Sequence, residues 1–182
     1  MSWLLMASEN ANAAGKIDLH TAINVNGSKQ WILMRGNNTS KPVVLFVHGG
    51  PGSPLTYFSR AFDGAFIDDF VVVHWDQRGA GKSFDAAESA LNYRLPQYVD
   101  DGLVVVEHIR EKLKKKKVLL VGHSWGTMVA FNMLAQRPKV FRSLVTVGTV
   151  SNMGEMERYR YQRVRAAVES SGDKEALHTL KN

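Results

Sequence analysis

The stretch "VLLVGHSWGTMVAF", residues 118–131, is the part of the sequence that decides the fold. It opens on an apolar run typical of a buried strand, and the apolar residues after Trp125 predict a helix. Between them stands Ser124 in the pattern G-x-S-x-G. A serine on such a strand-to-helix turn presents its hydroxyl as a nucleophile. A serine nucleophile needs a histidine to accept its proton and an acid to orient that histidine.

Ser124 can also be interpreted as a helix cap, because serine is common at the residue that precedes a first helical turn. The G-x-S-x-G pattern is weak by itself, since glycine and serine are frequent residues. Its position supports the nucleophile, because a strand precedes it and a helix follows it. Developing negative charge is favoured at a helix N-terminus. Ser124 is therefore the candidate nucleophile.

Apolar runs of similar length lie on both sides of this stretch. They are "VVLFVH" (43–48), "FVVVHW" (70–75) and "LVTVGTV" (144–150). Together with 118–122, these runs are typical of strands buried on both faces. Residues 17–25 and 29–35 flank Asn26-Gly27, a strong turn signal, and predict an antiparallel hairpin before the sheet.

Helices are predicted between these strands. A helix over roughly 97–115 has apolar residues at helical spacing, namely Val99, Leu103, Val106, Ile109 and Leu113. A second helix follows Ser124 and ends at Pro138, which cannot donate a backbone hydrogen bond. Strands that alternate with helices indicate crossover connections and a parallel sheet. We therefore predict an α/β fold of mostly parallel strands, preceded by an antiparallel hairpin.

Three regions of the chain differ in character. The 182 residues suit one domain of ordinary size. We divide them into an N-terminal extension at 1–15, the α/β core at 16–150 and a polar, helical segment at 151–182. The last segment is interrupted at Ser170-Ser171-Gly172 and does not continue the alternation of strands and helices.

Charge and composition exclude several classes of function. The formal net charge is +6, much of it from Lys114–Lys117 and from the arginines at 158, 160, 163 and 165. The lysines end a predicted helix, where cations complement the dipole, and the arginines match no nucleic-acid motif. We therefore expect no nucleic-acid partner. No apolar run reaches the ~18 residues that span a bilayer, so we expect no membrane partner. The sequence has no cysteine, which excludes disulfides and thiolate metal sites.

The N-terminal residues "MSWLLMASENANA" look like the remnant of a signal peptide. Trp3 to Met6 is apolar, and Ala11-Asn12-Ala13 resembles a cleavage site. The apolar part is shorter than a signal peptide requires, and no positive charge precedes it. We expect a cytoplasmic protein, or a secreted or periplasmic one if this segment is such a remnant.

A second glycine-rich motif, His48-Gly49-Gly50-Pro51-Gly52, ends the predicted strand at 43–48. Its glycines let the backbone approach a ligand and direct N–H groups at it. This loop can therefore supply one oxyanion donor, with the Trp125 N–H as the other. An ordinary glycine-rich turn is the alternative. Two such motifs at the ends of neighbouring strands favour the functional interpretation.

A third stretch, "HWDQRGAGKS" at 74–83, suggests a phosphate-binding loop. However, G-x-x-x-x-G-K-[ST] needs a glycine where this chain has Asp76. A dinucleotide-binding pattern fails too, because no glycine follows Gly79-Ala80-Gly81 at the needed spacing. We expect instead a polar turn at the edge of the sheet, in which Asp76 and Arg78 brace neighbouring loops.

Taken together, HGGPG, WDQRGAGKS and GHSWG resemble, in this order and spacing, the α/β-hydrolase superfamily and its proline iminopeptidase-like branch. The resemblance covers roughly residues 20–150 and implies that Ser124 is the nucleophile. It also implies that Gly50 and Trp125 donate to the oxyanion, and it implies no metal or organic cofactor. His123 departs from the glycine common at that position in iminopeptidases, which leaves a broader ester or amide hydrolase open. Residues after 150 would begin a helical cap.

The resemblance places the triad acid and histidine after the nucleophile, behind further strands. The candidates in this chain are Asp173 and His178, which are five residues apart and so do not share a helical face. His48 and His74 precede the serine, and we expect both to be structural. We therefore expect the acid and the histidine to be absent, which would make this chain the N-terminal part of a hydrolase.

The expected function is hydrolysis of small amides or esters through an acyl-serine intermediate, with aminopeptidase activity of the proline iminopeptidase kind as the specific form. The substrate would be a small molecule or a short peptide. The alternative is a non-catalytic protein, either a truncated fragment or a subunit that needs a complementing chain. Without further strands, the run at 144–150 would be a bare sheet edge, which predicts self-association or a complementing chain.

Overall fold

The computed structural model describes residues 15–87 and 93–180. The signal-peptide-like residues 3–13 lie outside the described part of the chain. The strands are β1 (Ile17–Val25), β2 (Ser28–Gly36), β3 (Val43–Val47), β4 (Val71–Asp76), β5 (Val118–His123) and β6 (Phe141–Val147). The α-helices are α1 (Ser59–Phe62), α2 (Leu95–Lys112), α3 (Trp125–Gln136), α4 (Met153–Ser171) and α5 (Lys174–Thr179). Short 3₁₀ turns are η1 (Thr56–Phe58), η2 (Asp63–Ala65), η3 (Gly81–Ser83) and η5 (Pro138–Val140).

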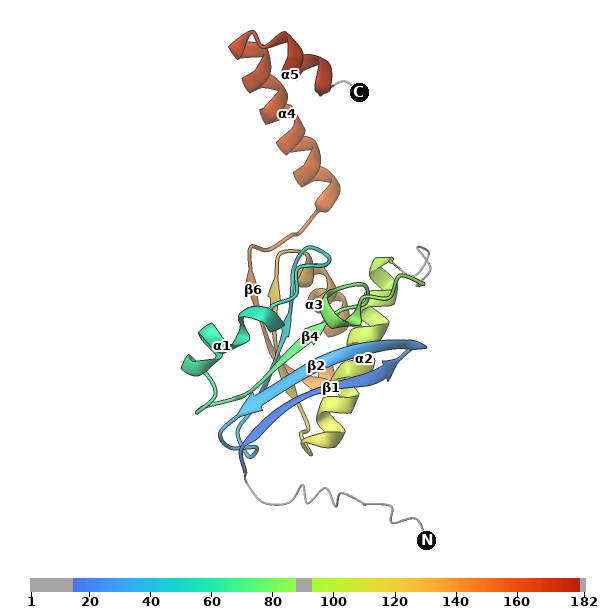
Figure 1. Ribbon diagram of the computed structural model, residues 1–182, viewed down its shortest axis with the longest axis vertical. Coiled ribbons are helices and arrows are strands. Elements are labelled where there is room, and N and C mark those ends of the chain that lie inside the picture. Colours follow the sequence, from blue (N-terminus) through green and yellow to red (C-terminus); the bar gives the residue numbers. More distant parts are fainter. Residues whose placement is uncertain (1–14, 88–92, 181–182) are drawn as a thin grey trace. The chain divides into compact units, whose positions relative to one another are not determined.

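The strands form a six-stranded sheet in the order β1-β2-β4-β3-β5-β6 (Figure 1). Strand β2 pairs antiparallel with both β1 and β4, whereas β4, β3, β5 and β6 run parallel to one another. Asn26 and Gly27 make the hairpin turn with φ of 48° and 79°, as a tight two-residue turn requires. The predicted α/β fold, with an antiparallel hairpin before a mostly parallel sheet, is confirmed.

The position predicted for the last strand, 144–150, is wrong. Strand β6 begins at Phe141, directly after the η5 turn, and ends before Gly148, whose φ is 60°. The expectation that this strand is buried on both faces is also wrong, since Val145 and Val147 are 53% and 51% exposed. The reason is that β6 is the last strand of the described sheet, so its side chains have fewer neighbours to cover them than those of an inner strand.

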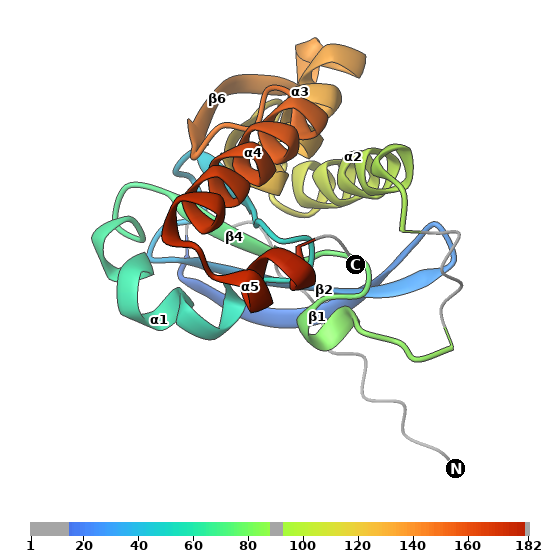
Figure 2. The same cartoon turned by 90° about the horizontal axis from the view of Figure 1, so that it is seen from above.

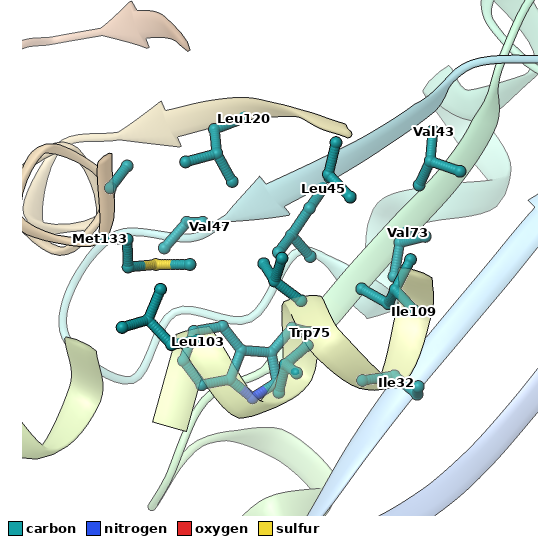
Figure 3. Packing of buried hydrophobic residues seen from close by; sticks show 14 of the residues in the cluster. Ile32, Val43, Leu45, Val47, Val73, Trp75, Leu103, Ile109, Leu120 and Met133 are labelled. Carbon is teal, nitrogen blue, oxygen red and sulfur yellow. The ribbon is translucent and has the colours of Figure 1, made fainter. Parts of the chain in front are cut away.

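Helices α2 and α3 lie side by side against one face of the sheet, as Figure 2 shows. Their apolar residues meet the inner strands in a buried cluster that includes Trp75, Leu103 and Met133 (Figure 3). A Cβ added at Gly102 would lie 2.6 Å from Met133 Sδ, so this glycine lets the two helices approach each other. The helix predicted at 97–115 is confirmed, and the buried residues on its inner face include Val99, Val106 and Ile109.

Residues Val150–Asn182 form a second compact unit, which is described by itself. Helix α4 begins where the Asn152 side chain accepts a hydrogen bond from a backbone N–H of the first turn (3.0 Å). It ends at Gly172, whose φ of 70° is the left-handed conformation that commonly terminates helices. The predicted interruption at 170–172 is confirmed. In the described part of both units, no helix is long and apolar enough to cross a membrane.

Candidate active site

Ser124 lies on the turn that joins β5 to α3, at the carboxyl end of an inner strand. Its φ of 50° and ψ of −120° fall in a region that residues other than glycine rarely occupy, at a cost of about 1–3 kcal/mol. Its N–H donates to Val147 O (2.8 Å), and its carbonyl accepts from the N–H and the hydroxyl of Thr127 (2.8 and 2.6 Å). These bonds fix the backbone, and the side chain stays partly exposed. The predicted strand, turn and helix around this serine are confirmed.

The glycines of the G-x-S-x-G motif allow backbone segments to pack in direct contact. A Cβ added at Gly126 would overlap the carbonyl oxygen of Val47 in the neighbouring strand β3. A Cβ added at Gly122 would lie 2.9 Å from the Gly126 carbonyl oxygen, closer than real Cβ atoms approach. Because the obstructing atoms belong to the backbone, they cannot rotate away. The first turn of α3 therefore sits on β3 at a distance that only glycine permits.

The Gly126→Ala variant is expected to lose about 3 kcal/mol of unfolding free energy, the upper end of the usual range for overpacking. The added methyl group forces α3 away from β3, and urea unfolding measures the loss. The matched control is Gly154→Ala in α4, where the added Cβ has only the Asn152 side chain nearby, at 3.8 Å. That control should unfold at an unchanged or slightly higher urea concentration. A Gly126→Ala variant as stable as wild type would contradict this description of the turn.

The glycine-rich loop after β3 folds against the serine turn. A Cβ added at Gly49 would lie 3.0 Å from Nδ1 of His123 and 3.1 Å from Cβ of Ser124. The next residue, Gly50, is exposed and has a φ of 116°, which glycine adopts without strain. The structure therefore brings the backbone of this loop to the same turn that carries Ser124 and Trp125. The role of the Gly50 and Trp125 N–H groups as oxyanion donors stays a prediction.

His48 anchors this loop from the protein interior, where it is 1% exposed. Its Nδ1 lies 2.9 Å from Gly49 O, and its Nε2 accepts a hydrogen bond from the Gln77 N–H (3.2 Å). The Gln77 side-chain amide donates in turn to His48 O (2.8 Å). Since Nε2 accepts, the proton of the neutral ring is on Nδ1 and is donated to Gly49. These contacts tie the loop after β3 to the loop after β4, and they fit the structural role expected for His48.

Burial lowers the pKa of His48, and the same cause lowers the pKa of His20 and of His108. Below the ordinary histidine pKa of about 6.5, the unfolded chain binds protons that the folded chain does not. Stability is therefore highest above that pH and falls as the pH drops. We expect a smaller unfolding free energy near pH 5.5 than near pH 7.5 in urea titrations, and a smaller difference in the His108→Gln variant. Equal stability at the two pH values would contradict the lowered pKa values of these histidines.

The residues after β4 form a compact internal turn. Asp76 is buried, and its carboxylate accepts hydrogen bonds from the Thr56 hydroxyl and the Lys82 N–H. Its carbonyl accepts the Ser83 hydroxyl (2.6 Å). A Cβ added at Gly81 would overlap the Asp76 carboxylate, so the glycine is required by this turn. The residues that suggested phosphate binding are thus used to organise the turn, as expected for Asp76.

Arg78 forms a buried ion pair with Asp101 of α2. The guanidinium meets the carboxylate at two points, Nε to Oδ2 (2.8 Å) and Nη2 to Oδ1 (3.0 Å), and both side chains are at most 3% exposed. The same carboxylate accepts hydrogen bonds from the side-chain amides of Gln30 (2.7 Å), Asn26 (2.8 Å) and Gln97 (2.9 Å). This network joins the hairpin turn, the loop after β4 and helix α2. It confirms that Arg78 braces neighbouring loops.

A second buried pair supports the sheet beside α1. His74 Nε2 lies 2.8 Å from Asp63 Oδ1, and Asp63 Oδ2 accepts from Arg35 (3.2 Å). Sequence reasoning missed both Asp63 and Asp101 as partners of these groups. The available signal for Asp101 was a carboxylate among the apolar residues of a helix that must pack on a sheet. A buried carboxylate requires a cationic partner, and Arg78, already expected to brace neighbouring loops, was a cation that could supply it.

Within the described residues of the first unit, 15–87 and 93–149, no side chain forms a hydrogen bond with the Ser124 hydroxyl. The ring nitrogens of His48 bond to Gly49 and Gln77, and His74 Nε2 bonds to Asp63. Asp173 and His178 belong to the second unit, where the Asp173 carboxylate accepts two backbone N–H groups (3.1 and 2.9 Å) and caps α5. The expectation that this pair does not complete the triad stays a prediction.

Comparison with known proteins agrees with this geometry. A family model described as alpha/beta hydrolase fold matches residues 42–179. The chain is 33% identical over 148 residues to the "probable aminopeptidase YbaC" of Bacillus subtilis (strain 168), covering 81% of this chain and 46% of that protein. It is 31% identical over 127 residues to a proline iminopeptidase of Lactobacillus helveticus (strain DPC 4571), covering 69% and 42%. The chain thus spans less than half the length of these curated relatives.

Solved structures share the fold. A proline iminopeptidase-related protein from Thermus thermophilus superposes with a TM-score of 0.67 at 21% identity, covering 90% of this chain and 56% of that one. An epoxide hydrolase from Vigna radiata superposes with a TM-score of 0.60 at 31% identity, covering 71% and 38%. The similarity therefore extends over several kinds of hydrolase, and the site residues must decide which chemistry applies.

Proposed function

This chain belongs to the α/β hydrolase fold family, and we propose that it carries the nucleophile of a serine hydrolase that cleaves small amides or esters. The conformation of Ser124 is the observation that carries this proposal. A helix-capping serine has extended backbone angles and accepts a hydrogen bond from the helix. Ser124 instead has a φ of 50°, and its side chain makes no capping hydrogen bond. Strain of this kind clusters at functional sites, and it supports the nucleophile over the cap.

The proposed reaction proceeds through an acyl-serine intermediate. The Ser124 Oγ attacks the substrate carbonyl carbon, its proton passes to a base, and the carbonyl oxygen becomes an oxyanion. The N–H groups of Gly50 and Trp125 donate to that oxyanion, where donors at a helix N-terminus stabilise developing charge. The base returns the proton to the leaving amine or alcohol, and the tetrahedral intermediate collapses to the acyl-enzyme. Water then attacks the acyl group and regenerates the serine.

We place the base and the orienting acid outside residues 1–182. The support is that the buried histidines of the core, His48 and His74, bond to other groups. His123 precedes the nucleophile directly and forms no hydrogen bond with it among the described residues. A serine without a base keeps its proton at neutral pH and is a poor nucleophile. By itself, the 182-residue chain would then be a non-catalytic part of the enzyme.

Removal of a free N-terminal residue is the specific activity that we propose. It is supported by the similarity to a probable aminopeptidase and to proline iminopeptidases. A form of the protein extended past residue 182 to include the acid and histidine should hydrolyse both proline p-nitroanilide and p-nitrophenyl acetate. Turnover of the ester without turnover of the anilide would reject the aminopeptidase and leave an ester hydrolase. Turnover of neither would reject the serine hydrolase as a whole.

We also propose that the outer edge of β6, which pairs with no strand in the described part of the chain, recruits another strand, because a strand edge with exposed valines readily pairs with other chains. Light scattering of the 182-residue chain should show an average mass that rises with concentration. The Val145→Lys variant should reduce this association, since lysine on an edge strand opposes pairing. The control Val164→Lys changes a residue of similar exposure (50%) in α4 and should leave it unchanged. A monodisperse, cooperatively melting monomer would contradict this proposal.

A further inference from the structure

We propose that the hollow at the amino ends of β3, β5 and β6 is a binding site for an organic phosphate. The cavity has a volume of about 530 Å³, within the ~300–1,000 Å³ typical of small-molecule sites. Pro42 and Leu119 give it an apolar wall. Its cations are Lys115, Lys116, Lys117 and Arg142, and no carboxylate lines it in the part of the chain that the structure describes.

This cavity lies away from the candidate active site. Leu119 is near the first residue of β5, whereas Ser124 follows the last one. Five residues of strand, each rising about 3.3 Å, separate the two by about 16 Å. The cavity therefore opens at the opposite end of the sheet from the nucleophile. A ligand bound there would not be the hydrolysed substrate, and this proposal does not rest on the proposed function.

The cations of the cavity are available to a ligand. The Lys115 ammonium donates to the Ser40 carbonyl (2.7 Å), which holds it at the cavity wall. Lys117 and Arg142 are exposed, and neither forms an ion pair with a carboxylate among the described residues. Burial lowers the pKa of Lys115, the direction expected of an ammonium without a nearby anion.

An adjoining hollow shares Lys115 and Lys116 with this cavity and is also lined by Glu107 and Glu111. Glu107 in that hollow is paired with Arg110 (2.6 Å) and Arg137 (3.3 Å). Its charge is therefore already compensated. Several cations gathered in a concave surface raise the local concentration of anions.

The donor set favours a phosphate group over a carboxylate. Arginine presents two parallel N–H donors, which match two phosphate oxygens, and the lysines add donors from other directions. A phosphate dianion offers more acceptor oxygens and more charge than a carboxylate. The apolar wall of Pro42 and Leu119 would contact an organic group attached to the phosphate. A soluble phosphate monoester and a phospholipid headgroup share this chemistry.

Calorimetric titration of the 182-residue chain with phenyl phosphate tests the site. Wild type should bind one equivalent, and the double variant Lys117→Gln/Arg142→Gln should bind at least about tenfold more weakly, as expected when charge-assisted hydrogen bonds are lost. The control Arg158→Gln/Arg163→Gln removes the same charge from α4 and should bind like wild type. Both double variants change exposed side chains, and a thermal melt by circular dichroism verifies that they fold.

Binding to lipid vesicles distinguishes a phospholipid headgroup from a soluble phosphate monoester. If wild type sediments with phosphatidic acid vesicles but not with phosphatidylcholine vesicles, and the Lys117→Gln/Arg142→Gln variant does not sediment with either, the ligand is a lipid headgroup. Binding of phenyl phosphate alone would assign a soluble monoester. If the α4 control weakened phenyl phosphate binding equally, the effect would come from net charge alone, and the proposed site would be overturned. Absence of binding to phenyl phosphate and to both kinds of vesicle would overturn it as well.

Discussion

The Ser124→Ala variant is expected to lower kcat on the order of 10⁶-fold in a form of the protein that carries a complete triad. Without the hydroxyl, no acyl-enzyme forms, and the base has no nucleophile to activate. The oxyanion donors and substrate binding should still leave roughly 10³–10⁴-fold catalysis over water. Initial rates on p-nitrophenyl acetate measure this loss, which should fall on kcat with little change in KM.

The matched control for this experiment is Ser143→Ala, which removes an exposed hydroxyl from β6. It should leave both kcat and KM unchanged, since Ser143 lies outside the serine turn. If Ser124→Ala kept a tenth or more of the wild-type rate, the nucleophile would have to be another residue. The strained backbone of Ser124 would then need a different explanation.

The Asp101→Ala variant is expected to lose about 3–5 kcal/mol of unfolding free energy, the usual cost of removing one partner of a buried ion pair. It removes the carboxylate that is paired with the buried Arg78 guanidinium, and it leaves the side-chain amides of Gln30, Asn26 and Gln97 without their acceptor. Because domains are stable by only about 5–15 kcal/mol, this one change should remove much of the total. Urea unfolding followed by tryptophan fluorescence measures it.

The neighbouring residue offers a close control, because Asp100 in the same helix is exposed. Asp100→Ala should change the unfolding free energy by no more than about 0.5 kcal/mol. The double variant Arg78→Met/Asp101→Leu should recover part of the loss, since it replaces both members of the buried ion pair by apolar side chains. Equal stabilities for Asp100→Ala and Asp101→Ala would contradict the buried network.

Local patterns in the sequence predicted the fold well where the residues of a single strand or turn are sufficient to identify it. Strands β3 and β4 are almost entirely buried, and β5 alternates buried with partly exposed residues, so their apolar runs locate all three directly. The serine turn is also local, because its glycines and its nucleophile lie within five residues of sequence. Strand β6 was misplaced because it is the last described strand, where half-exposed positions mix polar and apolar residues.

Contacts between residues far apart in the sequence could not be predicted in the same way. Asp101 accepts hydrogen bonds from residues 71 and 75 positions away. These distant residues meet because of the sheet order, in which β2 and β4 are neighbours although β3 separates them in the chain. The tie between His48 and Gln77 depends on the same order, since it joins loops after β3 and β4. Such networks require the assembled sheet.

The central claim is that Ser124 is a nucleophile whose base and acid lie outside these 182 residues, and labelling with a fluorophosphonate probe tests it most directly. Mass spectrometry of tryptic peptides should find the probe on Ser124 in the form extended to include the acid and histidine, and little or none on the 182-residue chain. Rapid labelling of the 182-residue chain that Ser124→Ala abolishes would contradict the claim by showing that the base is within it, and His178→Ala and His48→Ala would then identify that base. An extended form that stays unlabelled at Ser124 would contradict the nucleophile itself.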